Sequence, residues 1–432
     1  MRVLLINPPF YRLLGSHYNG LNLGKAYLAA VLKKEGHFVG LYDADYAPQD
    51  WYPDQAAIFH GFEQYKKALE PSSPIWQEIR AAILDFKPEL VGITVYTGAW
   101  QSMLNITRII REHSPSTKIV IGGPHPTLDL WGTASLIKEG LVDYVVAGEG
   151  EEEIVRLTTP QDLHLATGIV IANRIQDLNS LPFPLRNSFI HDTKFMDLGN
   201  ILTGRGCPHG CTYCASPAIW KRRVILRSVK NVMIEIRQMV DSGIKLIRFC
   251  DDTFNIKIDR AIQLCKELIP LGIEWVCDAR GDNLNRELLD IMKKSGCRRI
   301  KIGVESGSDR ILKSIKKGFT IEQIKHGVEL IHDADIPLTA YFMCGFPEEA
   351  DEDVQQTLEL ARWMDADYYS ISVFTPYFGT EEYKVAEAAG RVNHNAKWET
   401  FYHQSGTMIA NDKLNPTTVE KLLALNEGRK RL

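Results

Sequence analysis

Three cysteines stand close together in the segment GRGCPHGCTYCASP, at Cys207, Cys211 and Cys214. Their Cys-x3-Cys-x2-Cys spacing lets three thiolates bind three irons of a 4Fe–4S cluster, which leaves the fourth iron open to an external ligand. A structural zinc site normally closes its tetrahedron with four protein ligands, and no fourth cysteine or histidine follows at a finger-like distance. Gly206 and Gly210 let the backbone pass close to a cluster. The pattern therefore predicts an iron–sulfur centre with one open iron, in preference to three unrelated free thiols.

The cysteines lie at the start of a series of strand-like segments separated by helical patterns. The six strand segments are GNILTGRGC, IKLIRFCDD, IEWVCDARGD, RRIKIGVESG, PLTAYFMCGFP and YYSISVFTPY. Six such units predict a partial (β/α)6 barrel, complete or open, over residues 196–385. Residues that act in barrels of this kind lie at the carboxyl ends of the strands.

A separate alternation of apolar strands and amphipathic helices fills residues 1–165, from VLLIN to VVAGEGEEE. It predicts an α/β domain with a doubly wound, Rossmann-like parallel sheet. Ligands of such sheets bind at the carboxyl ends of the strands. The candidate contact residues at these ends are Thr94, Tyr96, Thr97, Gly122, Gly123 and Glu149.

Two further segments complete the predicted organisation. Residues 166–195 include LNSLPFPLRNSF, whose prolines indicate an extended linker. Residues 386–432 show a mixed pattern that predicts a short helical C-terminal segment.

Composition restricts the possible environments of the chain. The net charge of −4 argues against an extended basic surface, and so against nucleic-acid binding. The apolar run before Pro8 is only five residues long, which predicts a buried strand and not a signal peptide. No run reaches the length of a membrane span. We therefore expect a cytoplasmic protein whose eight cysteines are free thiols and metal ligands.

The cysteine motif after the first barrel strand, with Tyr213 before its third cysteine, resembles the radical S-adenosylmethionine superfamily. The resemblance implies that the amino and carboxylate groups of S-adenosylmethionine bind the open iron. It also implies an electron donor, such as flavodoxin or ferredoxin, whose electron cleaves the sulfonium to methionine and a 5′-deoxyadenosyl radical.

Later strand ends resemble the same superfamily. In RFCDDTF, Asp251 and Asp252 would accept from the ammonium of S-adenosylmethionine, or would instead cap the following turn. In DARGD, Arg280 would meet the carboxylate, and in IGVESG, Glu305 and Ser306 would face the ribose hydroxyls. YFMCGFPEE resembles the segment beside the adenine, and PYFGT resembles the turn after the sixth strand.

The other cysteines of the barrel have open interpretations. Cys344 replaces the usual aliphatic residue, and is either a small core residue or a catalytic donor of a hydrogen atom to a radical. Cys250, Cys265, Cys277 and Cys297 are expected to be core residues.

The first domain resembles the cobalamin-binding domain fused to many radical S-adenosylmethionine enzymes, through VLLINPPF, LGKAYLAAVLKKEGH, LYDAD, KPELVGIT, KIVIGGPHPT and VVAGEGEEE. The resemblance implies cobalamin, with Thr94, Tyr96 and Thr97 near the corrin. The nucleotide tail would pass Gly122 and Gly123, and Glu149 would either contact the tail or stabilise a helix N-terminus. The chain has no Asp-x-His-x-x-Gly motif, so no residue is predicted to bind the cobalt. His125 is interpreted as a turn histidine.

The leading hypothesis is a methyltransferase that methylates an unactivated carbon of a small molecule or peptide, through the 5′-deoxyadenosyl radical and methylcobalamin. The alternative is a radical S-adenosylmethionine enzyme that catalyses a rearrangement, cyclisation or epimerisation without methylation. A third hypothesis, a redox-sensing cluster carrier, is disfavoured by Arg280 and Glu305, which require a polar ligand above the cluster.

Overall fold

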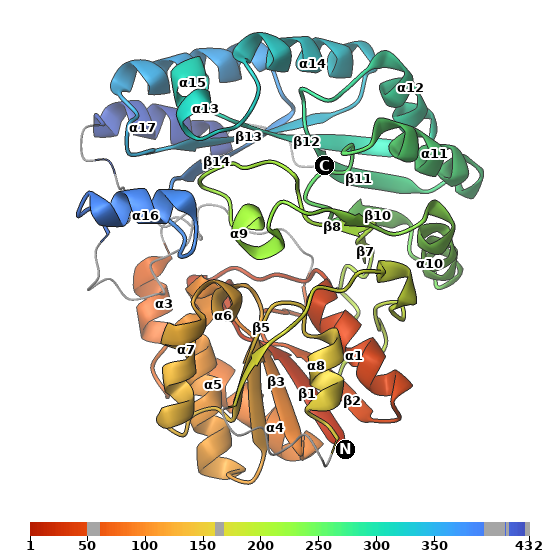
Figure 1. Ribbon diagram of the computed structural model, residues 1–432, viewed down its shortest axis with the longest axis vertical. Helices are drawn as coiled ribbons and strands as arrows, with labels where there is room; N and C mark the ends of the chain where they lie inside the picture. The colour runs from red at the N-terminus through yellow and green to blue at the C-terminus, as the bar shows by residue number, and fades with distance from the viewer. Residues whose placement is uncertain (50–60, 160–167, 393–410, 412–413, 428–432) are drawn as a thin grey trace. The chain divides into compact units, whose positions relative to one another are not determined.

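The computed structural model describes residues 1–49, 61–159, 168–392, 411 and 414–427. The chain divides into two compact units, one formed by residues 1–198 and the other by the described residues from Gly199 onwards. Each unit is built around its own parallel β-sheet (Figure 1). This confirms the predicted α/β class.

The sheet of the first unit has six parallel strands in the order β2-β1-β3-β4-β5-β6. Its strands are β1 (Arg2–Asn7), β2 (Phe38–Asp43), β3 (Leu90–Thr94), β4 (Lys118–Gly122), β5 (Tyr144–Ala147) and β6 (Ile169–Ile171). The chain order reverses between β1 and β3, which is where doubly wound sheets bind ligands. Strand β6 differs from the expected linker over 166–195, because its three residues pair with β5 and extend the sheet.

Both faces of this sheet are covered by helices, as the doubly wound prediction requires. The helices are α1 (Leu23–Lys34), α3 (Phe62–Ala68), α4 (Pro74–Phe86), α5 (Trp100–His113), α6 (Pro124–Leu128), α7 (Leu130–Lys138) and α8 (Glu151–Arg156). Along β1, Leu4 and Ile6 pack with α4 and α5, while Val3 and Leu5 pack with α1 and α8 (Figure 1). Burial on both sides explains why VLLIN is apolar at every position but the last.

The second unit contains an open sheet of six parallel strands in the order β14-β13-β12-β11-β10-β7. The strands are β7 (Asn200–Ile201), β10 (Leu246–Phe249), β11 (Glu274–Ala279), β12 (Cys297–Glu305), β13 (Leu338–Cys344) and β14 (Tyr368–Val373). Strands β7 and β14 are the two edges, so the (β/α)6 sheet does not close into a full barrel. A short antiparallel pair, β8 (Gly204–Arg205) and β9 (Ile225–Leu226), stands beside it.

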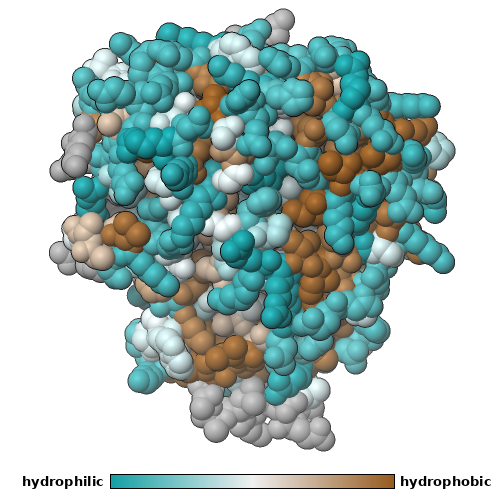
Figure 2. Space-filling view, turned by 45° about the horizontal axis from the view of Figure 1, so that its top comes forward, coloured by the Kyte–Doolittle hydropathy of each residue, from teal (hydrophilic) through white to brown (hydrophobic). Residues whose placement is uncertain are grey.

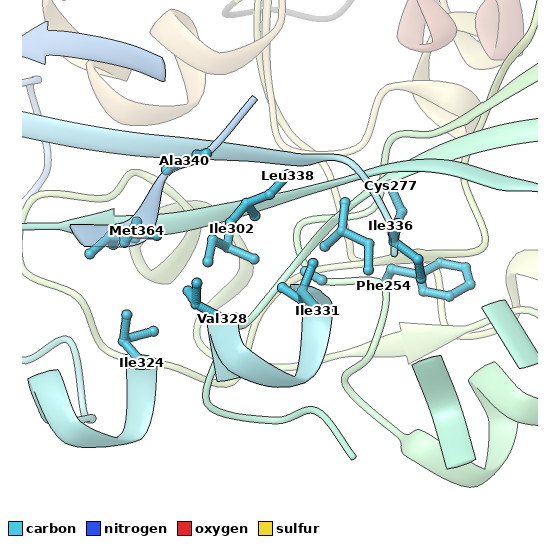
Figure 3. Packing of buried hydrophobic residues seen from close by; sticks show 14 of the residues in the cluster. Phe254, Cys277, Ile302, Ile324, Val328, Ile331, Ile336, Leu338, Ala340 and Met364 are labelled. Carbon is cyan, nitrogen blue, oxygen red and sulfur yellow. The ribbon is translucent and has the colours of Figure 1, made fainter. Parts of the chain in front are cut away.

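Helices cover one face of this sheet and form the larger core with it. They are α10 (Val229–Asp241), α11 (Ile258–Leu268), α12 (Arg286–Lys294), α13 (Asp309–Ser314), α14 (Ile321–Asp333) and α15 (Asp351–Met364). Figure 3 shows Val328 and Ile331 of α14 directed toward Ile302 and Leu338 of the strands. The remaining helices are α9 (Ser216–Trp220), α16 (Glu381–Ala388) and α17 (Pro416–Leu423). Most of the expected C-terminal helical segment lies outside the described residues.

The outer surface seen in Figure 2 is mostly hydrophilic, with hydrophobic residues in smaller patches. Within the described residues, none of the helices is long and apolar enough to cross a membrane.

Candidate functional site

The three motif cysteines share one loop between β8 and α9 of the second unit. Cys211 is buried, and Cys207 and Cys214 are half-buried. Cys214 has both other thiols among its electrostatic neighbours, and Cys207 has Cys211, so the loop gathers all three sulfurs. Gly206 has a φ of 97°, a backbone conformation that favours glycine at the entry to this loop.

Three thiols in one loop could bind a single metal ion or a cluster. In the described part of the chain, no group of three or more histidine, cysteine or acidic side chains could hold a metal ion. In a 4Fe–4S cluster each thiolate binds a different iron, so the three sulfurs lie farther apart than the ligands of one ion. Burial raises the pKa of Cys207, and raises that of Cys214 to about 12. A metal centre would favour the thiolate form, as thiol ligands require.

Asp251 fixes the strand that leads into this loop. Its carboxylate accepts hydrogen bonds from the Thr203 N–H (2.6 Å), the Gly204 N–H (3.3 Å) and the Thr203 hydroxyl. The Arg260 guanidinium also donates to the Thr203 hydroxyl (3.1 Å) and is an electrostatic neighbour of Asp251. The structure thus uses the buried Asp251 carboxylate to anchor the loop, an arrangement different from the predicted contact with S-adenosylmethionine.

Asp252 lies closer to the thiols. It is exposed, accepts a hydrogen bond from the Ser216 hydroxyl (2.9 Å) and is an electrostatic neighbour of Cys207 and Cys214. Of the two predicted aspartates, Asp252 is therefore the one that is exposed and lies near the thiols of Cys207 and Cys214.

Glu305, at the end of β12, belongs to a buried triad with Tyr213 and Lys317. The Tyr213 hydroxyl and the Lys317 ammonium both donate to Glu305 Oε1, at 2.9 and 2.7 Å. Glu305 has a φ of 71° beside a break in the β12–β13 register, which turns its carboxylate toward the loop. Gly303 leaves the necessary space, since a Cβ there would lie 2.5 Å from Glu305 Oε1. The triad joins the cysteine loop to the carboxyl edge of the sheet.

Arg280, at the end of β11, lies beside this triad. Its Nε and Nη2 donate to the two carboxylate oxygens of Asp282 (2.8 and 2.9 Å), and Nη2 also donates to the Lys317 carbonyl (3.1 Å). The guanidinium stacks on the Phe319 ring at 5.1 Å. Lys317 and Asp282 contact the predicted site residues Glu305 and Arg280, and neither was predicted from the sequence. The only sequence signal for Asp282 was its place two residues after Arg280, and Lys317 had none.

Two predicted residues are enclosed by the protein. The Ser306 hydroxyl is fully buried, accepts from the Ser308 N–H (3.2 Å) and contacts the Thr357 hydroxyl (3.3 Å). Cys344 is also fully buried, within the core cluster, and its thiol donates to the Ser372 carbonyl. These are the surroundings of packing residues.

The four cysteines that were expected in the core differ in their burial. Cys265, Cys277 and Cys297 belong to the core, as predicted, whereas Cys250 is exposed because it follows the last residue of β10. The prediction for Cys250 was therefore wrong.

In the first unit, glycines follow the carboxyl ends of β4 and β5. Gly123 has a φ of 106°, and a Cβ there would lie 3.2 Å from the Val95 backbone. Gly148 has a φ of 99°, and its Cβ would lie 3.0 Å from the Ala172 carbonyl. Gly122 precedes this turn. These contacts are with the chain itself, so the glycines allow the turns to pack closely. This glycine cradle lies at the sheet edge where doubly wound folds bind their ligands.

The polar residues predicted at this edge differ in their hydrogen-bond partners and in their exposure to solvent. The Thr97 hydroxyl is hydrogen-bonded to His125 Nδ1 (3.0 Å), and burial lowers the pKa of His125 to about 4. Glu149 accepts from the Ile175 N–H (2.9 Å), so it anchors the chain after β6. Tyr96 is 48% exposed, while burial around its hydroxyl raises its pKa. Thr94 ends β3 and is half-buried.

A buried polar network at the ends of β1 and β2 was not predicted. The Lys25 ammonium donates to Asp43 (3.2 Å) and to the Tyr42 carbonyl (2.9 Å), and the Asn7 amide also donates to Asp43 (2.9 Å). Asp45 accepts from the Phe10 N–H (2.7 Å). The network lies beside the switch point of the sheet, where it fixes the loops that follow both strands.

Asp45 makes the stability of the chain depend on pH. Burial, and then the nearby charge of Asp43, raise the pKa of Asp45 from 3.8 to about 7. The folded state therefore holds a proton that the unfolded state releases, so stability falls as pH rises from about 4 to about 7. We expect Asp45→Asn to flatten this part of the profile, measured as the free energy of unfolding in urea at a series of pH values. An unchanged slope in the variant would contradict this assignment.

Two family models match the chain. Residues 14–158 match the B12 binding domain, and residues 201–361 match the radical SAM superfamily. The two matches coincide with the two units and include the glycine cradle and the cysteine loop, respectively.

Similar proteins extend these matches over most of the chain. An uncharacterized methyltransferase of Pyrococcus horikoshii is 30% identical over 413 residues, which cover 89% of this chain and 83% of the relative. An anaerobic magnesium-protoporphyrin IX monomethyl ester cyclase of Rubrivivax gelatinosus is 27% identical, covering 87% of this chain and 68% of the relative. The solved structure of TsrM from Kitasatospora setae, a radical S-adenosylmethionine methyltransferase with cobalamin and a 4Fe–4S cluster bound, superposes with a TM-score of 0.65. It is 19% identical and covers 90% of this chain and 75% of TsrM, a likeness of fold.

Proposed function

The chain belongs to the radical S-adenosylmethionine enzymes that carry a B12-binding domain, and on this premise we propose that it methylates an unactivated carbon of a small molecule. The observation that carries the proposal is the similarity to a methyltransferase over 89% of the chain. Both cofactor sites fit their ligands, since one unit gathers three thiols and the other has a glycine cradle at its ligand edge.

When bound, the cluster and cobalamin supply one-electron chemistry and a methyl carrier. The chain supplies positioning. Cys207, Cys211 and Cys214 hold three irons, and Asp252 accepts from the ammonium group of S-adenosylmethionine. Asp282 fixes the plane of the Arg280 guanidinium, whose Nη1 has no partner among the described residues and donates to the methionine carboxylate. These charge-assisted contacts orient the sulfonium toward the cluster.

Glu305 meets the ribose hydroxyls through the carboxylate oxygen that Tyr213 and Lys317 leave open. The Lys317 ammonium supplies the counter-ion that a buried carboxylate requires. Thr94, Tyr96, Thr97, Gly122 and Gly123 receive the cobalamin. A small one-electron protein such as flavodoxin or ferredoxin donates the electron, and the cytoplasm, where thiols stay reduced, is the compartment.

The test uses the full chain, purified without oxygen and reconstituted with iron, sulfide and cobalamin. Incubation with S-adenosylmethionine and a strong reductant should yield both S-adenosylhomocysteine, from methyl transfer, and 5′-deoxyadenosine, from reductive cleavage. Absorption spectra report whether each cofactor has bound. Failure to form either product with both cofactors present would contradict the proposal.

A second candidate is a ring-forming or rearranging reaction without methyl transfer. It is favoured by the similarity to anaerobic cyclases over 87% of the chain. The same assay separates the candidates, because such an enzyme would form 5′-deoxyadenosine without S-adenosylhomocysteine.

A further inference from the structure

The sheet of the second unit has one apolar face and one polar face. Residues of β12 alternate between them: Ile300 and Ile302 pack into the core, whereas Arg299 and Lys301 point to the side opposite the core helices. The register of neighbouring strands extends this pattern. Arg299 is opposite Val276, Lys301 is opposite Asp278 and Thr339, and Gly303 is opposite Tyr341. The face of β11, β12 and β13 that lies away from helices α10 to α15 is therefore largely polar, and we call it the inner face.

Positive charge predominates on this face. Arg248, Arg299 and Lys301 project from β10 and β12. The acidic residues on the same face of β11 are Asp278 and Glu274, and Glu274 is paired with Arg298. Asp278 is already paired, because it accepts from the Lys301 ammonium at 3.1 Å. Their side chains are 36% and 26% exposed, so solvent and small solutes reach this part of the face.

Arg299 is left without a counter-ion within 4 Å among the described residues. Its guanidinium lies 5.9 Å from the Tyr368 ring, and Asp367 acts on it only at longer range. The Asp367 carboxylate instead accepts from the Leu338 N–H (2.8 Å). The Nε of Arg299 is buried and forms no hydrogen bond there. A partly buried guanidinium without a counter-ion lowers the stability of the fold, unless a ligand supplies the missing hydrogen bonds and negative charge.

Thr339, on the neighbouring strand β13, also has a buried polar atom without a hydrogen-bond partner among the described residues. Its hydroxyl is buried, with the residue 2% exposed, and has no hydrogen-bond partner in the described structure. The register places Thr339 between Lys301 of β12 and Tyr368 of β14. Lys301 follows Arg299 by two residues on the same strand, and the Tyr368 ring is the one near the Arg299 guanidinium. Two unsatisfied donors, one charged and one neutral, thus lie on neighbouring strands of one face.

We propose that this face binds the substrate through an anionic group, a carboxylate or a phosphate, held by Arg299, Lys301 and the Thr339 hydroxyl. The inference rests on the proposed function, because it names the class of molecule that the radical chemistry acts on. A planar guanidinium matches two oxygens of either anion, and a hydroxyl supplies a third donor. Tyr341 and Tyr368 border the site and supply flat surfaces for the rest of the molecule.

The position of the cations limits the shape of such a substrate. Lys301 and Arg299 precede Glu305 by four and six residues, which corresponds to about 13 and 20 Å along a strand. Glu305 marks the carboxyl edge beside the cysteine loop. The substrate is therefore an elongated molecule, with its acidic group on the inner face and its reacting carbon toward that edge.

The experiment measures anion binding without turnover. The reconstituted full chain is dialysed to equilibrium against labelled inorganic phosphate or labelled acetate, at constant ionic strength. We expect Arg299→Gln to weaken binding of the preferred anion by about tenfold or more, the loss of about 1.4 kcal/mol. Arg299→Lys should lose less, because it keeps the charge and loses only the planar fork. Thr339→Val, an isosteric change, should weaken binding severalfold.

Arg298→Gln is the matched control. Arg298 is the adjacent residue of the same strand, and it pairs with Glu274 at 2.8 Å with its side chain 47% exposed. It should leave anion affinity unchanged. Tighter binding of phosphate than of acetate would identify a phosphate ester as the substrate group, and comparable binding would identify a carboxylate.

The inference is overturned if the wild-type chain retains neither anion, or if Arg298→Gln weakens binding as much as Arg299→Gln does. Because no product is measured, a failure of methyl transfer leaves the binding result intact. Conversely, an unchanged affinity in Arg299→Gln alongside normal product formation would refute only this inference.

Discussion

Cys211→Ala should abolish the reductive cleavage of S-adenosylmethionine. Cys211 is the buried middle member of the three loop thiols, and both Cys207 and Cys214 have it as an electrostatic neighbour. Its loss would leave a second iron without a protein ligand, beside the iron that is open to S-adenosylmethionine. We expect a larger effect than the about 10–100-fold loss caused by removing a residue that only hydrogen-bonds to a metal ligand. Formation of 5′-deoxyadenosine after anaerobic reconstitution measures the activity, and visible absorption and iron content measure the cluster.

Cys250→Ala is the control for this experiment. Cys250 is the exposed cysteine after β10, and it lies outside the motif but next to Asp251. Its replacement should leave iron content and absorption unchanged. Undiminished cleavage by Cys211→Ala, with a normal cluster spectrum, would show that the loop does not hold the cluster.

Lys317→Met should destabilise the second unit strongly. Lys317 and Glu305 form a 2.7 Å ion pair in which their side chains are only 8% and 10% exposed. Removal of the lysine leaves the Glu305 carboxylate, at a backbone φ of 71°, buried without its counter-ion. Breaking a buried pair in this way typically costs about 3–5 kcal/mol. The free energy of unfolding in urea measures the loss.

Two further variants test whether this loss of stability comes from the uncompensated charge of Glu305. The double variant Lys317→Met, Glu305→Gln should regain part of the stability, because it removes the uncompensated charge. Lys316→Met is the matched control. Lys316 pairs with Glu381 at 2.6 Å with both side chains more than half exposed, and such pairs contribute at most about 1 kcal/mol. Equal losses from Lys316→Met and Lys317→Met would contradict the assignment.

The triad of Glu305, Tyr213 and Lys317 also predicts an effect on the binding of S-adenosylmethionine. If Glu305 holds the ribose, Glu305→Gln should raise the KM for S-adenosylmethionine more than it lowers the iron content. A residue that acts only in folding would change the cluster and the stability without this separate effect on KM.

The sequence by itself determined the features that depend on local spacing. The three cysteines lie within eight residues, so their spacing already placed three thiols in one loop. Strand and helix patterns repeat over a few residues, and both parallel sheets followed from them. The same local information indicated Gly122 and Gly123 as the turn after a strand.

Only the tertiary structure decided which distant residues act together. Asp251 anchors Thr203 across 48 positions, and Glu305 meets Tyr213 across 92. Lys317 reaches Tyr213 across 104 positions, and no periodicity or motif identified this lysine. Side chains on the inner face of the second sheet are likewise brought together only by strand register, which sets Lys301 between Asp278 and Thr339. Hydrogen bonds and ion pairs act over a few ångströms in space, so their partners cannot be identified from positions along the chain until the fold has placed them.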